Sequence, residues 1–455
     1  MANFSQYLLS LFLAAFTSFS SAQTQTSDSK NNTLLKDVTL IDGNGGPAQQ
    51  HMDVLIRDGR IEEIGKGLQS KDAVVVNLAG KTVMPSLMSA HVHVGALKGT
   101  TTVPANYTRE NVLSQLKKYE DYGVSAVLSM GSDRPLIFET GLVDSSGRGF
   151  LPGARMYSAG FGFGVPQGAP PVELAMDRVY RPASPEQVIV QMDSLAALKP
   201  AMVKIWVDDF AGKFKKMDPA IYKAVISEAH KHNLRVTSHV YYLSDARKLV
   251  ADGLDVIGHS VRDSVITDDL VQLMKRNNVV YIPTLSLDEF SFIYARKPEW
   301  INDPFFKASL EPGVYEMITS EKYQSDLMNS PAYKRNMAGF DIALKNLKKI
   351  FDAGILVALG TDSGAMPLRA QGFSEHLELE LMVQAGLTPS QAIVVATKNA
   401  AQVLKSDQHY GILKKGNYAD LIVLDANPLE NIKNTRKINR VYKAGKEVSK
   451  GPVLK

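Results

Sequence analysis

Two histidines one residue apart, His91 and His93, follow the apolar run PSLMSA in a chain that contains nine histidines. On a β-strand, residues i and i+2 point to the same side, so both imidazoles would face one space. Such an arrangement is costly unless something in that space, such as a metal ion, binds both imidazoles. A surface turn with two solvated histidines explains the same pair, so the rest of the chain has to distinguish the two interpretations.

Other residues that could bind a metal follow similar short apolar runs. Lys204 lies in MVKIWV, His239 in LRVTSHV, His259 in DVIGHS and Asp362 in ILVALGTD. Amphipathic segments such as PAIYKAVISEAHKHN separate most of these runs, which indicates strands that alternate with helices. The strand before the first histidine pair and the runs at 125–132, 154–160 and 279–285 complete a set of eight strands.

Eight strand–helix units over about 320 residues predict a (β/α)8 TIM barrel, which is a closed ring of parallel strands. A doubly wound open sheet is the main alternative, but no G-x-G-x-x-G follows any strand. In a barrel, functional residues collect at the C-terminal ends of the strands, which is where the candidate ligands lie. The barrel therefore predicts that these side chains meet at one mouth.

A second pair of the same kind, His230 and His232 in HKHN, belongs to the opposite end of the predicted barrel. It ends a helix and precedes a strand, and the partial negative charge of a helix C-terminus suits histidine there. We therefore interpret this pair as structural. We expect His376, which follows the last strand, to lie on a helix face.

Strand-like segments flank the middle of the chain at both ends. Residues 34–84 and 406–455 alternate apolar and polar positions between glycine and aspartate turns, and we expect them to form one discontinuous β-sandwich domain. The barrel domain is then assigned to residues 85–405. An insertion at about 286–335 follows a strand, where a lid or specificity element and a purely structural excursion are equally good explanations.

The composition restricts both the ligands and the partners. Cysteine is absent, which excludes disulfides and thiolate ligands, so a metal must be bound by His, Asp, Glu or Lys. Such ligands suit zinc, manganese and related divalent ions. The formal charge of +4, without a basic cluster, does not indicate a nucleic-acid partner.

The first residues resemble an export signal. An apolar stretch at 7–16 precedes Ser-Ser-Ala at 20–22, so we predict a signal peptide at 1–22 and a flexible leader at 23–33. The stretch is short for a membrane span, and no stable span is expected after cleavage. The mature protein is therefore predicted to be periplasmic or secreted.

Lys204 is the unusual member of the candidate ligand set. A buried ammonium would be desolvated and also repelled by nearby cations. A neutral amine avoids that repulsion. A lysine carboxylated by carbon dioxide fits better still, because its carboxylate could bridge two ions about 3.5–4 Å apart.

These motifs together resemble the amidohydrolase superfamily, and within it the imidazolonepropionase-like and prolidase-like branch. The resemblance covers essentially the whole mature chain and includes MPSLMSAHVH, MVKIWV, VTSHVYY, VIGHS, LGTDSG and the run ELELMVQAGLTPSQAIVVATKNAAQVL before GILKKGNYADLIVLDANPL. Two departures lie around the pocket. LSMGS stands where relatives often have Arg-Asp, and GFGFGVPQGAPP has no histidine where relatives often have Gly-Gly-His.

The resemblance implies two divalent ions, with zinc as the leading candidate. It also implies six ligands: His91, His93, Lys204, His239, His259 and Asp362. The histidines of the first strand would bind the more buried ion, and the two later histidines would bind the more exposed one. Lys204, present as N6-carboxylysine, would bridge the two ions.

The resemblance also implies a catalytic role for Asp362. This carboxylate would bind the more buried ion, accept a proton from a metal-bridging hydroxide as it attacks the substrate, and pass that proton to the leaving amine. Tyr241 would lie on the same face as His239 if the strand continues, and would then hydrogen-bond the developing oxyanion.

The sequence therefore predicts an exported binuclear amidohydrolase that cleaves a C–N bond (amide, peptide or cyclic amide) in a small molecule or short peptide. A lactonase, carboxylesterase or phosphotriesterase would use the same centre. A catalytically inactive relative that acts as a binding protein is an alternative of a different class, disfavoured because all six ligand positions are filled. Arg262 is the nearest cation for a substrate carboxylate, or simply a surface arginine. The oligomeric state is left open, a homo-oligomer included.

Overall fold

The computed structural model describes residues 32–453, and no helix in this range is both long and apolar enough to cross a membrane. The predicted signal peptide at 1–22 lies outside the described residues. So does the predicted leader at 23–33, except for its last two residues, and Thr33 already begins the first strand.

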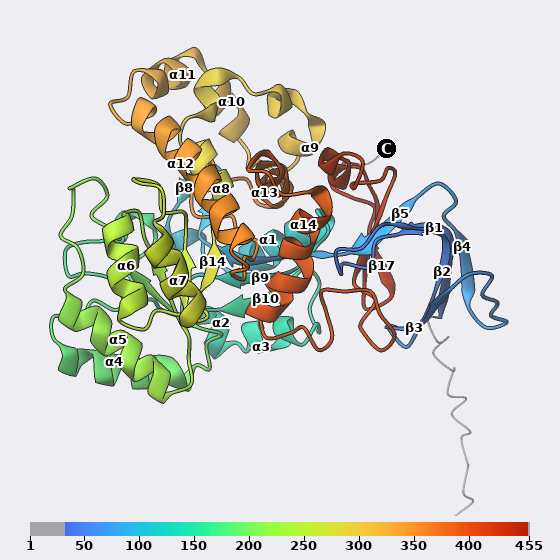
Figure 1. Ribbon diagram of the computed structural model, residues 1–455, viewed down its shortest axis with the longest axis horizontal. Helices are drawn as coiled ribbons and strands as arrows, with labels where there is room; N and C mark the ends of the chain where they lie inside the picture. The colour runs from blue at the N-terminus through green and yellow to red at the C-terminus, as the bar shows by residue number, and fades with distance from the viewer. Residues whose placement is uncertain (1–31, 454–455) are drawn as a thin grey trace, which may run out of the picture. The chain divides into compact units, whose positions relative to one another are not determined.

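The middle of the chain forms parallel strands that alternate with helices, as predicted (Figure 1). These strands are β6 (Leu87–Val92), β9 (Val124–Ser129), β10 (Arg155–Ser158), β11 (Val203–Trp206), β12 (Val236–His239), β13 (Val256–Gly258) and β14 (Val280–Ile282). They pair in the orders β10-β9-β6 and β11-β12-β13-β14, and every pairing is parallel. A short hairpin, β7 (Leu97–Lys98) and β8 (Thr101–Thr102), follows β6.

Backbone hydrogen bonds outside these strands join the two sheets into a ring. Ala201 N donates to Ser158 O (2.8 Å) and so connects β10 to the start of β11. On the other side, the segment 355–363 pairs with β14, where Ala358 N donates to Tyr281 O (3.0 Å), and with β6. This segment lies where the eighth strand is predicted, but it forms isolated bridges instead of a regular strand.

The ring separates two apolar layers. Small and medium side chains fill its interior, and they occupy alternating positions on β6 and β9. The interior set includes Met88, Ala90, Ala126, Leu128, Met202, Val256, Val280, Ile282 and Ala358. The opposite faces of the strands pack against the surrounding helices in a larger cluster.

Helix α1 (Arg109–Asp121) illustrates why the helices form and how they pack. The Thr108 side chain accepts from Asn111 N at the N-terminus, which satisfies one of the free amides there. Val112, Leu116 and Tyr119 are buried, and their spacing places them on one face of the helix, toward the strands.

The other helices of the barrel region lie between or after the strands. They are η1 (Pro104–Asn106), α2 (Leu136–Glu139), α3 (Leu142–Gly147), η2 (Val172–Leu174), α4 (Pro185–Ala197), α5 (Pro219–Lys231), α6 (Leu243–Ala251), α7 (Asp268–Arg276), α12 (Tyr333–Asp352), α13 (Phe373–Gln384), α14 (Pro389–Val394), the π-helical turn η5 (Val395–Asn399) and α15 (Ala400–Val403).

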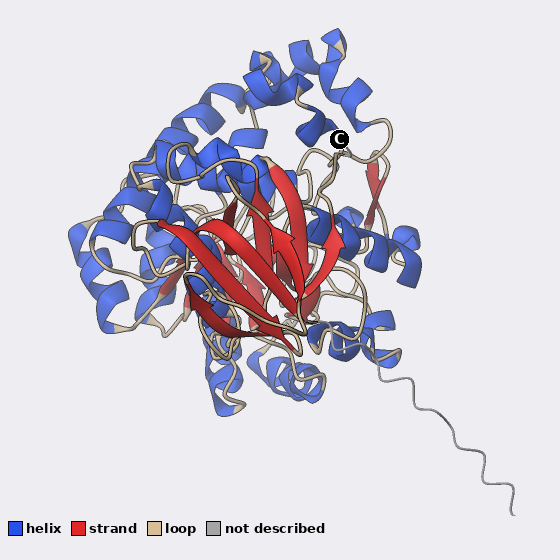
Figure 2. Ribbon diagram, turned by 90° about the vertical axis from the view of Figure 1, so that its right-hand side faces the viewer, coloured by secondary structure: helices blue, strands red, loops and turns tan. Residues whose placement is uncertain are grey.

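Strands from both ends of the chain form one eight-stranded sheet, which faces the viewer in Figure 2. They are β1 (Thr33–Leu40), β2 (Gln49–Arg57), β3 (Arg60–Gly65), β4 (Val74–Asn77), β5 (Thr82–Pro85), β15 (Leu421–Leu424), β16 (Ile438–Lys443) and β17 (Lys446–Ser449). The order is β17-β16-β15-β5-β1-β2-β3, with β4 beside β1, so β15 from the C-terminal end pairs with β5 from the N-terminal end. The short helix η6 (Ile432–Arg436) precedes β16.

The two faces of this sheet pack against different partners. On β15, Leu421 and Val423 join a cluster made by the strands of the sheet themselves, whereas Ile422 and Leu424 join the cluster of the barrel. This alternation is the expected result of a strand that is covered on both sides. The sheet therefore has its own apolar core and is also anchored to the barrel.

The insertion at about 286–335 is helical. It contains α8 (Leu285–Phe290), η3 (Ile293–Arg296), η4 (Glu299–Asn302), α9 (Pro304–Lys307), α10 (Val314–Thr319) and α11 (Glu321–Met328). Its aromatic side chains pack closely: Trp300 lies 4.7 Å from Phe306 and 5.0 Å from Phe373 of α13, between ring centroids. Tyr294 OH also donates to Leu368 O (2.7 Å), so the insertion supports the loop that follows the segment 355–363.

Candidate metal centre

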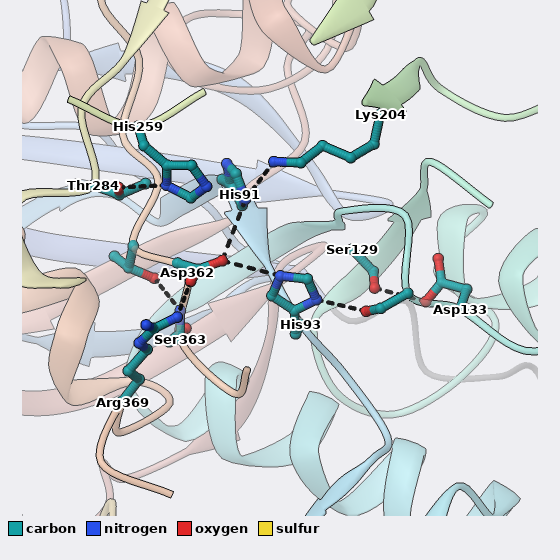
Figure 3. A network of polar contacts seen from close by, with 12 residues as sticks. His91, His93, Ser129, Asp133, Lys204, His259, Thr284, Asp362, Ser363 and Arg369 are labelled. Atoms are coloured by element: carbon teal, nitrogen blue, oxygen red, sulfur yellow. Dashed lines mark hydrogen bonds and ion pairs between the residues drawn. The ribbon is translucent and has the colours of Figure 1, made fainter. Parts of the chain in front are cut away.

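Three buried side chains meet at the C-terminal end of β6. His93 Nε2 lies 3.0 Å and His91 Nε2 lies 3.4 Å from the same oxygen, Oδ1 of Asp362 (Figure 3). These three ligand atoms lie within 4.8 Å of one another, which suits a single metal ion. We call His91, His93 and Asp362 the first half-site.

A bulge in β6 helps to bring both histidines to this point. The register against β9 shifts between Ser89 and Val92, so β6 has one residue more than its partner over this stretch. β6 itself ends at Val92, and His93 follows directly. Gly360 allows the segment 355–363 to pass close to β6 at His91, because a Cβ at Gly360 would lie 2.7 Å from His91 Cβ.

Two more histidines lie beside the first half-site. The ring of His259 is 4.4 Å from that of His91 and 4.3 Å from that of His239, between centroids. His239 ends β12 and His259 follows β13, so neighbouring strands present them at the same edge of the ring. We call His239 and His259 the second half-site.

Lys204 reaches the centre from β11. Its Nζ lies 3.3 Å from His91 Nε2, and the residue is 1% exposed. No carboxylate of the described residues forms an ion pair with it, and burial lowers the pKa of Lys204 to about 7. A buried lysine without a counter-ion is costly when charged, so this environment favours the neutral amine. The structure thus brings together all six side chains that the sequence analysis proposes as ligands.

Oxygen partners orient three of the four histidines. His93 Nδ1 lies 2.5 Å from Ser132 Oγ, and His259 Nδ1 lies 2.9 Å from Thr284 Oγ1. His239 differs, because its Nε2 lies 3.0 Å from Asp208 Oδ2. In each case one ring nitrogen is occupied and the other is left to bind a metal, an arrangement common around metal-binding histidines.

His91 has no such partner. Its Nδ1 is buried without a hydrogen bond to any described residue, so the polar contacts of this ring are those of Nε2, with Asp362 and Lys204. Burial, with Lys204 nearby, lowers the pKa of His91 to about 3. Burial also holds the pKa of His239 below its usual range and that of His259 well below it. Neutral imidazoles are the form that binds metals, so the donor set fits a metal centre.

Asp362 is presented by a tightly bonded loop. Its φ is +58°, in the left-handed region that aspartate tolerates better than most residues. The hydroxyls of its neighbours, Thr361 and Ser363, donate to the same oxygen of Glu375 (2.6 and 2.9 Å). Tyr119 OH lies 2.7 Å from Ser363 Oγ. Helix α13 thereby fixes the backbone on both sides of the carboxylate.

Helix α13 also positions the second half-site. One turn after Glu375, Glu378 accepts from the backbone N–H groups of Leu285 and Ser286, both at 2.7 Å. These bonds fix the start of α8 and with it Thr284, which has a φ of +53° and contacts His259. Two glutamates on one helix face therefore support both halves of the centre.

The charge on Asp362 is set by Arg369 and the histidines. Burial would raise its pKa, but Arg369, which forms an ion pair with Oδ2, and His91 and His93 at Oδ1 outweigh it. The pKa of Asp362 is consequently held well below its usual range. The carboxylate is ionised and divided between the histidines on one side and a guanidinium on the other (Figure 3).

Arg262 is not free to act as a simple surface cation. It forms an ion pair with buried Asp288 (2.9 Å), and its guanidinium lies 4.9 Å from the ring centroid of Tyr241. β12 ends at His239, so the condition under which Tyr241 would share a face with that histidine is not met. Tyr241 contacts Arg262 and the Tyr242 ring, and within residues 32–453 no side-chain hydrogen bond or ring contact joins it to either half-site.

The other histidines examined in the sequence lie away from the centre. His230 and His232 stand at the end of α5, where their Nε2 atoms lie 2.9 and 3.0 Å from Asp255 and Asp193. His376 is buried on α13, between Thr435 Oγ1 and Tyr122 O. Both structural interpretations agree with these contacts.

Four residues of the centre were missed by the sequence analysis: Ser132, Asp208, Thr284 and Arg369. Each follows a barrel strand or the segment 355–363 at the C-terminal end, where polar residues were expected. Their location just after the C-terminal ends of the strands is the feature of the sequence that could have identified them. The signal is weak because serine, threonine and arginine are not usual metal ligands. For Asp208, as for the other three, nothing in the sequence indicates which loop residue turns toward the centre.

Comparison with known proteins identifies the relatives of the chain. The family model described as "Amidohydrolase family" matches residues 82–448. Ochratoxinase from Aspergillus niger is 29% identical over 244 residues, which cover 52% of this chain but only 43% of that protein. Imidazolonepropionase from Shouchella clausii is 32% identical over 114 residues, covering 24% of this chain and 25% of that protein.

Solved structures agree on the fold. The crystal structure of A. niger ochratoxinase matches with a TM-score of 0.69 at 21% identity, covering 94% of this chain and 97% of that one. A Xaa-Pro dipeptidase with methionine bound in its active site matches with a TM-score of 0.70 at 24% identity, covering 92% and 99%. At these identities the likeness establishes the architecture, a barrel with a β-sandwich domain.

Proposed function

Because this chain belongs to the amidohydrolase family, we propose that it is a metal-dependent hydrolase that cleaves a carbon–nitrogen bond in a small molecule or short peptide. One observation carries the proposal. The Nε2 atoms of His91 and His93 converge on Asp362 Oδ1, with Lys204 Nζ 3.3 Å from His91 Nε2. Families of this fold use buried sites of this composition to hold divalent ions.

In this proposal the candidate ligands hold the ions and Asp362 transfers the proton. The first half-site would hold one divalent ion and the second half-site another, most simply zinc, and Lys204 would serve both as N6-carboxylysine. Two such ions supply an activated water at neutral pH and polarise a carbonyl oxygen. Asp362, ionised at rest, accepts a proton at its carboxylate and returns it to the leaving nitrogen, so that the amine departs neutral.

Arg369 and Glu375 support this role of Asp362 in different ways. Glu375 fixes the backbone through Thr361 and Ser363, so the carboxylate keeps its direction. Arg369 stabilises the ionised form through Oδ2, which keeps the proton off Asp362 until the reaction supplies one. The pairing must weaken when Asp362 takes up the proton.

A panel assay on the purified chain tests the proposed function. Metal content is measured first, and then hydrolysis of dipeptides, N-acyl amino acids and lactams, beside the matching esters, lactones and phosphotriesters. We expect turnover of at least one amide that a chelator removes and zinc restores. Turnover of only the oxygen esters would favour the lactonase or esterase alternative, and bound metal without any turnover would favour a binding protein.

Lys204 leads to a pH-dependent prediction. Its pKa of about 7 means that the neutral amine, the form that reacts with carbon dioxide, is about one-tenth populated at pH 6 and about nine-tenths at pH 8. At fixed dissolved carbon dioxide, reactivation of metal-free protein by zinc should therefore be about tenfold slower at pH 6 than at pH 8. His91, with a pKa of about 3, stays neutral over this range and therefore does not contribute to the pH dependence of the reactivation rate.

The control for this experiment is Lys204→Arg, which cannot be carboxylated. In the wild type the rate of reactivation should rise with dissolved carbon dioxide and with pH. In Lys204→Arg the remaining rate should depend on neither through carboxylation. A wild-type rate that is independent of both pH and carbon dioxide would contradict the assignment of N6-carboxylysine, while leaving hydrolysis itself untouched.

We also propose that the protein is exported, on the sequence of residues 1–22 alone. N-terminal sequencing of the protein recovered from outside the cytoplasm should begin at Gln23. A chain that retains Met1 and stays in the cytoplasm would exclude export.

A further inference from the structure

Asp208 is a buried carboxylate that the proposed reaction does not use. It follows β11 by two residues and is 4% exposed, and its Oδ2 lies 3.0 Å from His239 Nε2. No lysine or arginine of the described residues forms an ion pair with it. A carboxylate in such a place is costly unless its hydrogen bonds compensate for the lost water.

The contact determines which nitrogen of His239 is free. An ionised carboxylate only accepts hydrogen bonds, so at 3.0 Å the hydrogen must lie on His239 Nε2. In the neutral imidazole the lone pair is then on Nδ1. Asp208 thus selects one tautomer and one direction for metal binding.

The partners of the other oriented histidines select a tautomer less strictly. The partners of His93 and His259 are the hydroxyls of Ser132 and Thr284, which can donate as well as accept. A hydroxyl therefore accommodates either tautomer of its histidine. Asp362, which contacts His91 and His93, is itself a candidate ligand. Among the partners that are not candidate ligands, Asp208 is the one that carries a charge and only accepts.

The loop around Asp208 also holds the His239 ring from its face. Asp208 Oδ1 accepts from Phe210 N (3.1 Å), and the Phe210 ring stacks on His239 at 5.5 Å with 12° between the planes. Val207 N donates to His239 O (3.1 Å). One carboxylate thus joins the edge of the imidazole to the turn that covers its face, which opposes a flip of the ring.

We propose that Asp208 is a positioning residue for the second half-site: by orienting His239 it determines how tightly that half-site binds its ion. The inference rests on the proposed function, since it assumes two ions. Loss of such a partner typically lowers metal affinity 10- to 100-fold. The first half-site, oriented by other groups, should keep its affinity.

The test is a metal titration, with activity not required as a readout. Metal-free full-length protein is titrated with Zn²⁺ by calorimetry, and with Co²⁺ by its visible absorption, for the wild type and for Asp208→Ala, Asp208→Asn and Asp209→Ala. We expect two ions in the wild type. In Asp208→Ala, one of the two affinities should fall about 10- to 100-fold, and the Co²⁺ spectrum should lose the contribution of that site.

Two variants separate positioning from damage to the loop. Asp208→Asn keeps an oxygen that can accept from Nε2–H, so it should fall between Asp208→Ala and the wild type. Asp209 lies on the same loop but accepts from Tyr242 OH (2.9 Å), so Asp209→Ala should bind both ions normally. Thermal unfolding of the metal-free proteins verifies that each variant is folded.

Several results would overturn the inference. These are unchanged affinities in Asp208→Ala, an equal loss at both sites, or the same loss in Asp209→Ala. A wild type that binds no metal at all would instead refute the proposed function. The two failures are therefore distinguishable from the same set of titrations.

Discussion

Replacing Asp362 by Asn should lower kcat about a thousandfold while the protein stays folded. The amide preserves the shape of the carboxylate but has no charge for Arg369 and cannot accept and return a proton at neutral pH. Removal of a group that transfers protons in the rate-limiting step typically costs two to four orders of magnitude in rate. Steady-state kinetics on the best amide substrate measure the effect, with zinc content determined on the same samples.

Asp121→Asn is the matched control, because it makes the same chemical change at an ion pair with Lys117 on α1, on the outside of the barrel. It should leave kcat and metal content unchanged. If Asp362→Asn keeps more than about a tenth of the wild-type kcat, Asp362 is not the group that transfers the proton. If it loses its metal completely, ligation and proton transfer must be separated at saturating zinc.

Replacing His91 by Ala should remove both the ion of the first half-site and the activity. His91 is fully buried and lies between Lys204 and Asp362, so no other described side chain can take its place in the first half-site. Lewis-acid stabilisation worth several kcal/mol corresponds to about a thousandfold in rate or more. Elemental analysis of the purified variant, together with kcat, measures both losses.

His230→Ala is the control that the sequence itself offers, because His230 belongs to the second H-x-H. It lies at the end of α5 with Asp255 as its partner and is 42% exposed in its side chain. Exposed pairs of this kind contribute about 1 kcal/mol or less, so metal content and kcat should match the wild type. A wild-type metal content in His91→Ala would refute the first half-site.

Much of the architecture was predictable because it depends on local patterns. Alternating apolar runs and amphipathic segments indicate strands and helices from the residues alone, and the order of eight units points to a barrel. The segment 355–363 marks the limit of this reasoning. Its composition predicts a strand, but its glycine and the turn at Asp362 leave only isolated bridges, although it still closes the ring.

The ligand set was predictable for a related reason. In a parallel barrel every strand ends at the same mouth, so residues at strand ends converge whatever their separation in the chain. That rule places His91 beside Asp362 across 271 positions of sequence, and it also separates HKHN from the candidate metal centre. The same rule could not place Tyr241, because it depends on where β12 ends, which sequence patterns define poorly.

What only the tertiary structure decided is the direction of each side chain within the mouth. The bulge in β6, the left-handed backbone of Asp362 and the contacts of Ser132, Thr284 and Asp208 arise from loops packed against one another, mostly far apart in sequence. The chain by itself determined which candidate ligands come together, because their residue types and their places at the ends of successive strands can be read along the sequence. Which ring nitrogen is free for the proposed metal was decided in three dimensions, since a hydrogen bond depends on distances that no local pattern encodes.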